Sequence, residues 1–350
     1  MYSCFKNEFP GWQYAGRLVT ALLLICMVSI ANAQTIKLAT LAPEGSSWMN
    51  AMRAGASEIA TRTEGRVKFK FYGGGVQGND KTVLKKMRIG QLHGGAFTST
   101  ALVDFQKDAV LYGMPMLFNN LEEVQFVRER MDDKLRALIE QAGYVNFGFA
   151  GGGFAHIMSI RPIANLDDLS GLKVWVPDGD RVSYEAAKAL GVSPVTMPLT
   201  DVLTGLETEL IDTIMNSPAG TIVLQWNTKV SYITEFPLAY VFAMLVINKK
   251  YFNKIAPADQ LVVREVMEAI YQGFDQEGND DNDKAFKALI DDGMKVVIPD
   301  QGQIPQWQEA TRKSNHRLAA EGLVDAALLN EIECYVAAYR ANDQAKDCTQ

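Results

Sequence analysis

Strand-like and helix-like segments alternate along the first half of the chain, and this order constrains the fold more than any other feature. Residues 35–40 and 67–72 alternate between apolar and polar side chains, as half-buried strands do. The segment between them, from Ser47 onward, places its apolar residues at helical spacing. Strands that alternate with helices form parallel sheets with the helices as crossovers. The sequence therefore predicts an α/β fold, in which ligands gather at the carboxyl ends of the strands.

The alternation continues to a glycine triplet at residues 151–153, where we predict a hinge between two lobes. Helices are expected over residues 79–89 and 121–141, and a strand over residues 144–150 is expected to end at the triplet. Glycine permits the backbone freedom that a hinge needs. The predicted lobes are residues 34–152, joined by segments from about 240–270 and the C-terminal helices, and residues 153–239, joined by part of about 270–310.

A long helix is predicted over residues 257–290. Pro257 suits a first helical turn, and Val263, Met267 and Ile270 follow helical spacing. A helix of this length would reach across both lobes. The acidic run at residues 275–283 lacks the glycine that a calcium-binding loop needs at its sixth position, so we interpret the run as a solvated helix face.

The N-terminal 33 residues have the features of a cleaved signal peptide. Lys6 and Arg17 precede a short apolar run over residues 18–30, and an Ala-Asn-Ala sequence ends at Ala33. The run is short for a membrane span, although an uncleaved anchor is the alternative. Cleavage after Ala33 removes two basic residues and one acidic residue and so changes the formal net charge from −7 to −8. An acidic, exported protein without a basic tract is not expected to bind nucleic acid.

Two cysteines, Cys334 and Cys348, remain after residues 1–33 are removed. In an exported protein we expect them to form a disulfide that ties the last helix to the C-terminal tail, with two free thiols as the alternative. His93, His156 and His316 do not stand at the spacing of metal ligands, and no nucleophile, zinc-protease or phosphate-loop motif occurs. The sequence therefore predicts no metal, no cofactor and no enzymatic activity.

The most specific pattern comprises residues 166–177 (LDDLSGLKVWVP), 190–194 and 206–218. In this order and spacing it resembles the core signature of the solute-binding proteins of tripartite ATP-independent (TRAP) transporters, the DctP-like family. The resemblance implies a two-lobe, periplasmic-binding-protein-like fold of the class II type, with a long connecting helix and a ligand cleft between the lobes. It also implies a periplasmic receptor that closes on a small molecule and delivers it to membrane permease subunits. An exported α/β enzyme and a ligand sensor on the same fold are the alternatives.

The resemblance also assigns candidate ligand-binding residues. Trp175 falls at the position where the family usually has an arginine that holds a carboxylate, and Asn216 falls on an asparagine that often hydrogen-bonds the ligand. Strand ends and the glycine triplet suggest further contacts from Ser47, Trp48, Thr98, Ser99, Phe154 and Tyr240, with Gln77, Phe242, Arg161 and Arg181 as additional candidates.

Trp175 cannot replace the planar, charged fork of an arginine. It offers an apolar face, one N–H donor and a surface for cations. Three kinds of ligand remain open: a carboxylate held by Arg161 or Arg181, a cation that stacks on Trp175 beside Asp178 or Asp180, and a neutral, rather apolar molecule. We expect a ligand other than a simple dicarboxylate.

Overall fold

The computed structural model describes residues 33–349. The predicted signal peptide lies outside these residues except for Ala33. No helix within residues 33–349 is both long enough and apolar enough to cross a membrane.

The predicted α/β alternation is confirmed in the first half of the chain. Strand β1 (Gln34–Thr40) pairs in parallel with β2 (Val67–Tyr72) and with β3 (Gly94–Thr98). Helices α2 (Ser47–Arg62) and α3 (Asp80–Arg88) connect these strands. Helix α2 begins after Ser46, whose side-chain oxygen accepts a hydrogen bond from the Met49 N–H at 3.3 Å, as expected of an N-cap.

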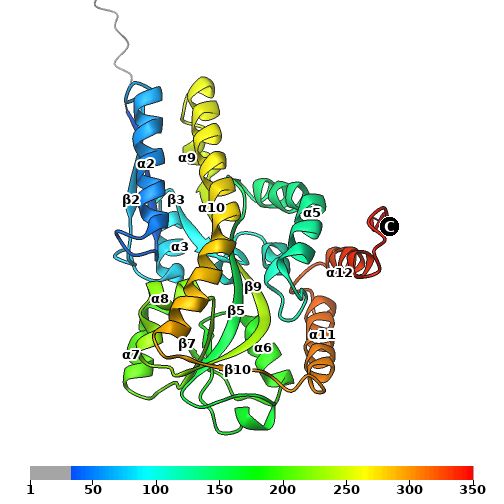
Figure 1. The fold of residues 1–350 in the computed structure, drawn as a ribbon. Helices are drawn as coiled ribbons and strands as arrows, with labels where there is room; N and C mark the ends of the chain where they lie inside the picture. Colours follow the sequence, from blue (N-terminus) through cyan, green and yellow to red (C-terminus); the bar gives the residue numbers. More distant parts are fainter. Residues whose placement is uncertain (1–32, 350) are drawn as a thin grey trace, which may run out of the picture. The chain divides into compact units, whose positions relative to one another are not determined.

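The other strand pairs of the main sheet are antiparallel except for one parallel pair, residues 295–297 with residues 232–234, so the sheet is mixed. The central strand β9 (Tyr232–Asn248) pairs antiparallel with β3 and β5 (Ala150–Ser159). The strand order is β2-β1-β3-β9-β5-β8, in which β8 is Thr213–Asn216, and β4 (Tyr144–Asn146) and β10 (Lys295–Val297) also pair with β9. Figure 1 shows β5 and β9 running together through the middle of the molecule. The remaining strands, β6 (Trp175–Pro177) and β7 (Val195–Met197), form a separate parallel pair.

The glycine triplet bends strand β5 without ending it. The prediction of a strand end at this point was wrong, because β5 continues through residues 151–153 to Ser159. Its pairing with β9 shifts register between Gly151 and Phe154, and Gly153 adopts a positive φ of 71° that favours glycine. Because β9 pairs with β5 on both sides of this irregularity, β5 is one continuous strand that contains a β-bulge.

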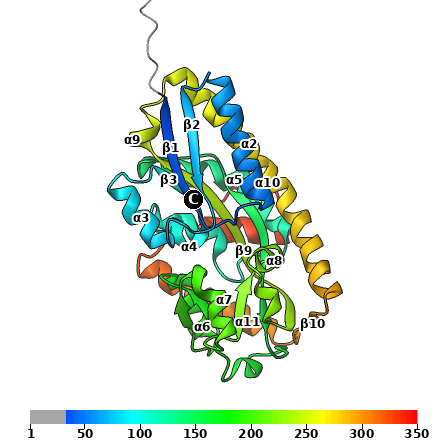
Figure 2. The same cartoon turned by 90° about the vertical axis from the view of Figure 1, so that its left-hand side faces the viewer.

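Helix α10 (Pro257–Asp291) is 35 residues long, which corresponds to about 52 Å. It packs beside α2 and along β5 (Figures 1 and 2). The backbones come close at Gly278, where an added Cβ atom would lie 2.2 Å from the Gly151 carbonyl oxygen. Asp275 accepts a hydrogen bond from the Gly151 N–H at 3.1 Å, and Asn282 Nδ2 donates to the Gly152 carbonyl. The long helix is therefore bound to the bulged part of β5.

The remaining helices surround the two sheets. They are α4 (Ser99–Leu102), α5 (Leu121–Gln141), α6 (Arg181–Ala189), α7 (Val202–Glu207), α8 (Pro218–Val223), α9 (Lys249–Phe252), α11 (Ile304–Ala320) and α12 (Ala326–Arg340), with 3₁₀ turns at Lys107–Gly113, Asp167–Leu169, Leu199–Asp201 and Trp226–Thr228. A disulfide joins Cys334 on α12 to Cys348, the two cysteines that the sequence left for such a bond.

Candidate functional site

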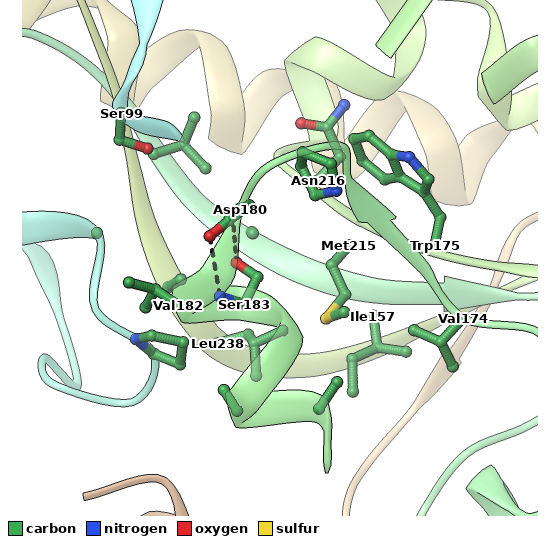
Figure 3. Close-up of a pocket in the computed structure, with 18 of the residues that line it drawn as sticks. Ser99, Ile157, Val174, Trp175, Asp180, Val182, Ser183, Met215, Asn216 and Leu238 are labelled. Carbon is green, nitrogen blue, oxygen red and sulfur yellow. Dashed lines mark hydrogen bonds between the residues drawn. The ribbon is translucent and has the colours of Figure 1, made fainter. Parts of the chain in front are cut away.

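A cavity of about 160 Å³, which we call the cleft, lies where the carboxyl ends of β3 and β8 meet the start of α6 (Figure 3). Thr98 and Ser99 reach it from the end of β3, and Asn216 reaches it from the end of β8. Asp180 and Ser183 reach it from the start of α6. The cleft thus lies at the carboxyl ends of strands, where the α/β pattern predicts a ligand site.

Most of the cleft wall is apolar. Figure 3 shows Ile157, Val174, Met215 and Leu238 gathered on one side of the cavity, and we call this part the chamber. The other apolar lining residues are Val110, Pro115, Ala155, Leu169, Pro177, Val182, Ala186, Ala187, Leu190, Val192, Leu199, Ala239 and Val241. An engineered apolar cavity of about 150 Å³ binds benzene, so a cleft of this volume suits a ligand about the size of one ring.

The polar groups of the cleft are partly engaged with one another. Asp180 caps α6, since its carboxylate accepts hydrogen bonds from the Ser183 N–H at 2.9 Å and from the Ser183 hydroxyl at 2.6 Å (Figure 3). The Asn216 side-chain oxygen accepts from the Ser217 N–H at 2.9 Å. Within residues 33–349 no hydrogen-bond acceptor contacts the Asn216 side-chain NH₂ group, which can therefore donate to a ligand.

No arginine, lysine or histidine lines the cleft in the described part of the chain. The ionisable groups among its lining residues are the carboxylate of Asp180 and the phenol of Tyr240. Burial raises the pKa of Tyr240 to about 12, so this phenol is neutral at pH 7. The cleft therefore offers no positive side chain to a bound anion.

A second cavity of about 180 Å³ adjoins the cleft, and we call it the mouth. Thr98, Pro177 and Leu199 line both cavities. The ionisable residues of the mouth are Asp80, Lys81, Asp104 and Asp178. Lys81 Nζ donates to Asp178 Oδ2 at 2.6 Å, and both side chains are partly exposed.

Trp175 belongs mainly to the hydrophobic core beside the cleft. The side chain lines the cavity, but the residue is only 4% exposed. Its indole N–H donates to the Met197 carbonyl oxygen at 3.0 Å, and its ring packs edge-on against Trp226 with the ring centres 5.2 Å apart. Most of the ring surface and its only donor are therefore already engaged.

Tyr240 is held against the cleft by a buried arginine that the sequence analysis missed. Arg128, on α5, is 8% exposed and donates from Nη1 to the Tyr240 hydroxyl at 3.1 Å. The same guanidinium pairs with Asp132 at 2.9 Å and with Asp275 of α10. The spacing of Arg128 and Asp132 along one helix was the only sequence signal for these interactions, because Tyr240 and Asp275 follow much later in the sequence.

The other predicted aromatic residues lie outside the cleft lining. Phe242 is 1% exposed and packs edge-on against Tyr112 and Phe149. Phe154 lines a separate cavity of about 180 Å³. Trp48, beside Ser47 at the start of α2, stacks on Phe274 with the ring centres 5.7 Å apart, and neither Ser47 nor Trp48 lines the cleft.

The candidate arginines are engaged elsewhere. Arg161 donates to the Asp168 carbonyl at 3.2 Å and to the Ser170 carbonyl, while Arg181 pairs with Glu321. Neither arginine lines the cleft. Gln77 also lies outside the lining, and its side-chain oxygen accepts from Lys86 Nζ at 2.9 Å.

The described part of the chain, residues 33–349, contains no group of three or more histidine, cysteine and carboxylate side chains that could hold a metal ion.

Comparisons with solved structures show the fold. A TRAP periplasmic solute-binding protein from Xanthobacter autotrophicus, with bound β-D-galacturonate, is 21% identical with a TM-score of 0.78 and covers 87% of this chain and 99% of its own. Another from Desulfovibrio salexigens, with bound orotic acid, is 16% identical with a TM-score of 0.78 and covers 88% of this chain and 99% of its own. The predicted two-lobe α/β architecture is thereby confirmed.

Comparisons of sequence show the family. The 2,3-diketo-L-gulonate-binding periplasmic protein of Escherichia coli is 24% identical over 68% of this chain and 73% of its own length. The C4-dicarboxylate-binding periplasmic protein of Rhodobacter capsulatus is 26% identical over 67% of this chain and 72% of its own length. The sequence profile of the DctP family, described as bacterial extracellular solute-binding protein, family 7, matches residues 38–321. This chain therefore belongs to the DctP family of bacterial extracellular solute-binding proteins.

Proposed function

We propose that this chain is the periplasmic receptor of a TRAP transporter. It is exported by cleavage after Ala33, captures a small molecule in the cleft and delivers it to membrane permease subunits, without catalysing a reaction. Membership of the DctP family supports this role. The proposed lobes, residues 34–152 and 153–239 with their returning segments, close on the ligand, which lets the protein bury most of it and later release it.

The ligand of this receptor is a small molecule without a carboxylate. This conclusion rests on one observation: no basic side chain lines the cleft in residues 33–349. Burying a carboxylate without a positive partner costs several kcal/mol. The neighbouring structures named above hold galacturonate and orotic acid, which are both acids. Their ligands are therefore a poor guide to the ligand of this chain.

The residues that line the cleft are expected to contact different parts of the ligand. The ring-sized, apolar body of the ligand fills the chamber, and Asn216, Thr98 and Ser99 form hydrogen bonds with its polar group. Trp175 and Tyr240 supply two aromatic rings to the wall. Asn216 can donate, and the hydroxyls of Thr98 and Ser99 can donate or accept.

A thermal-shift comparison of acidic and neutral compounds tests the proposal. Galacturonate, orotate and cyclohexanecarboxylate are expected to leave the melting temperature of the mature protein unchanged. Cyclohexanol, which has the ring size of the chamber, is expected to raise it. A ligand present at about 100 times its Kd stabilises by about 2.7 kcal/mol, or about 4 °C for a chain of this length. A rise of that size with any of the three acids would contradict the proposal.

A further inference from the structure

Most of the charged side chains around the cleft and its mouth are acidic. Asp180 lines the cleft, and Asp80, Asp104 and Asp178 line the mouth, where Lys81 is the sole basic residue of the described lining. A cavity bordered mainly by carboxylates attracts cations and repels anions. The electrostatic potential at this entrance therefore favours positively charged ligands over negatively charged ones.

Lys81 does not offset this acidic character. Its ammonium group is bound to Asp178 at 2.6 Å. Its side chain passes over Gly179, where an added Cβ atom would lie 3.4 Å from Lys81 Cε. A ligand carboxylate would have to share this ammonium group with Asp178, whereas a cation would leave the pair undisturbed.

Asp80 is the acid of the mouth that most needs a positive partner, and the exposed Asp104 lines the same cavity. Asp80 is the first residue of α3, and its carboxylate makes no hydrogen bond or ion pair with any residue in the described part of the chain. Burial, together with the charge of Asp104, raises the pKa of Asp80 to about 6. Two neighbouring carboxylates repel each other, and a cation between them removes the repulsion.

We propose that the ligand is a small organic amine whose apolar, ring-sized body fills the chamber and whose ammonium group lies at the mouth beside Asp80 and Asp104. This inference rests on the proposed function and narrows its substrate class. The two cavities share Thr98, Pro177 and Leu199 as lining, so one molecule can extend from the chamber to the acids.

The surroundings favour an ammonium group over a metal ion. Leu41, Ala101 and Val103 also line the mouth, and a metal ion needs a larger set of fixed ligands than this cavity offers. Among residues 33–349 the carboxylates here do not form a group that could hold a metal. An amine with an apolar body, in contrast, matches both the acids and the apolar walls.

Three probes with the same ring separate this inference from the proposed function. The melting temperature is measured in cyclohexylammonium chloride, cyclohexanol and sodium cyclohexanecarboxylate, with sodium chloride at equal ionic strength as the reference. We expect cyclohexylammonium to bind about tenfold more tightly than cyclohexanol. A cyclohexylammonium response no larger than that of cyclohexanol or sodium chloride overturns the amine inference alone. Stabilisation by cyclohexanecarboxylate overturns the proposed function itself.

Variants then locate the ammonium group. Asp80→Asn and Asp104→Asn are expected to remove the tenfold advantage of cyclohexylammonium and to keep the response to cyclohexanol, which shows that the cleft is intact. Asp133→Asn, on the exposed face of α5, is the matched control and should behave like the wild type. If both mouth variants bind cyclohexylammonium as tightly as the control does, the assignment of the ammonium group to Asp80 and Asp104 is wrong.

Discussion

Replacing Arg128 with methionine is expected to lower the free energy of unfolding by about 2–3 kcal/mol. The arginine is buried and binds Asp132, Asp275 and the Tyr240 hydroxyl. Methionine fills part of the same space but leaves two carboxylates and a phenol without their positive partner. Urea denaturation of the wild type and the variant measures the loss.

Arg264→Met is the matched control for this experiment. Arg264 also links α10 to α5, since it pairs with Glu140 at 3.1 Å, but both side chains are about one third exposed. Glu140 keeps Lys249 as a second partner at 3.6 Å. An exposed pair of this kind contributes about 1 kcal/mol or less. Equal losses for the two variants would show that the buried network around Arg128 contributes no more to stability than an exposed ion pair does.

Replacing Trp175 with alanine is expected to cost about 3–5 kcal/mol of stability, irrespective of ligand. The ring packs against Trp226 and is almost fully buried, so its removal leaves a cavity in the core. Thermal and urea denaturation without ligand measure the effect. A Trp175→Ala variant as stable as the wild type would contradict the core role and favour a purely ligand-binding one.

Trp175→Phe separates the ring from its N–H donor. The Met197 carbonyl oxygen that accepts from the indole also accepts from the Asp178 N–H at 3.1 Å, so it stays hydrogen-bonded in the phenylalanine variant. The loss of stability should then be below about 1.5 kcal/mol. A loss as large as that of the alanine variant would mean that the hydrogen bond, and not the packing of the ring, holds Trp175 in place.

Local patterns predicted the helices and the parallel strands well, because these elements depend on residues close together in sequence. The helix predicted over residues 257–290 is α10, Pro257–Asp291. From the sequence a strand is expected over residues 240–248 only, whereas β9 begins at Tyr232, because Pro237 interrupts the pattern. In the structure Pro237 lies where the pairing of β5 and β9 is irregular, between the Ala155–Ala239 and Ile157–Thr234 pairs, and a proline without an N–H is tolerated there.

The candidate site was predictable where strand ends define it. Thr98 and Ser99 were predicted from a strand end and Asn216 from the family resemblance, and all three line the cleft. The burial of Trp175 was not predictable, since it depends on Trp226, which is distant in sequence. The network of Arg128 with Asp275 likewise exists only after α5 and α10 have packed beside β9.

Because no basic side chain lines the cleft in residues 33–349, this protein is expected to take a ligand without a carboxylate. The most direct test is mass spectrometry of the compound released by denaturing receptor that was purified from the periplasm under native conditions. The released compound is expected to lack a carboxylate and to carry an amine. A released carboxylic acid, bound in a one-to-one ratio, would contradict this expectation.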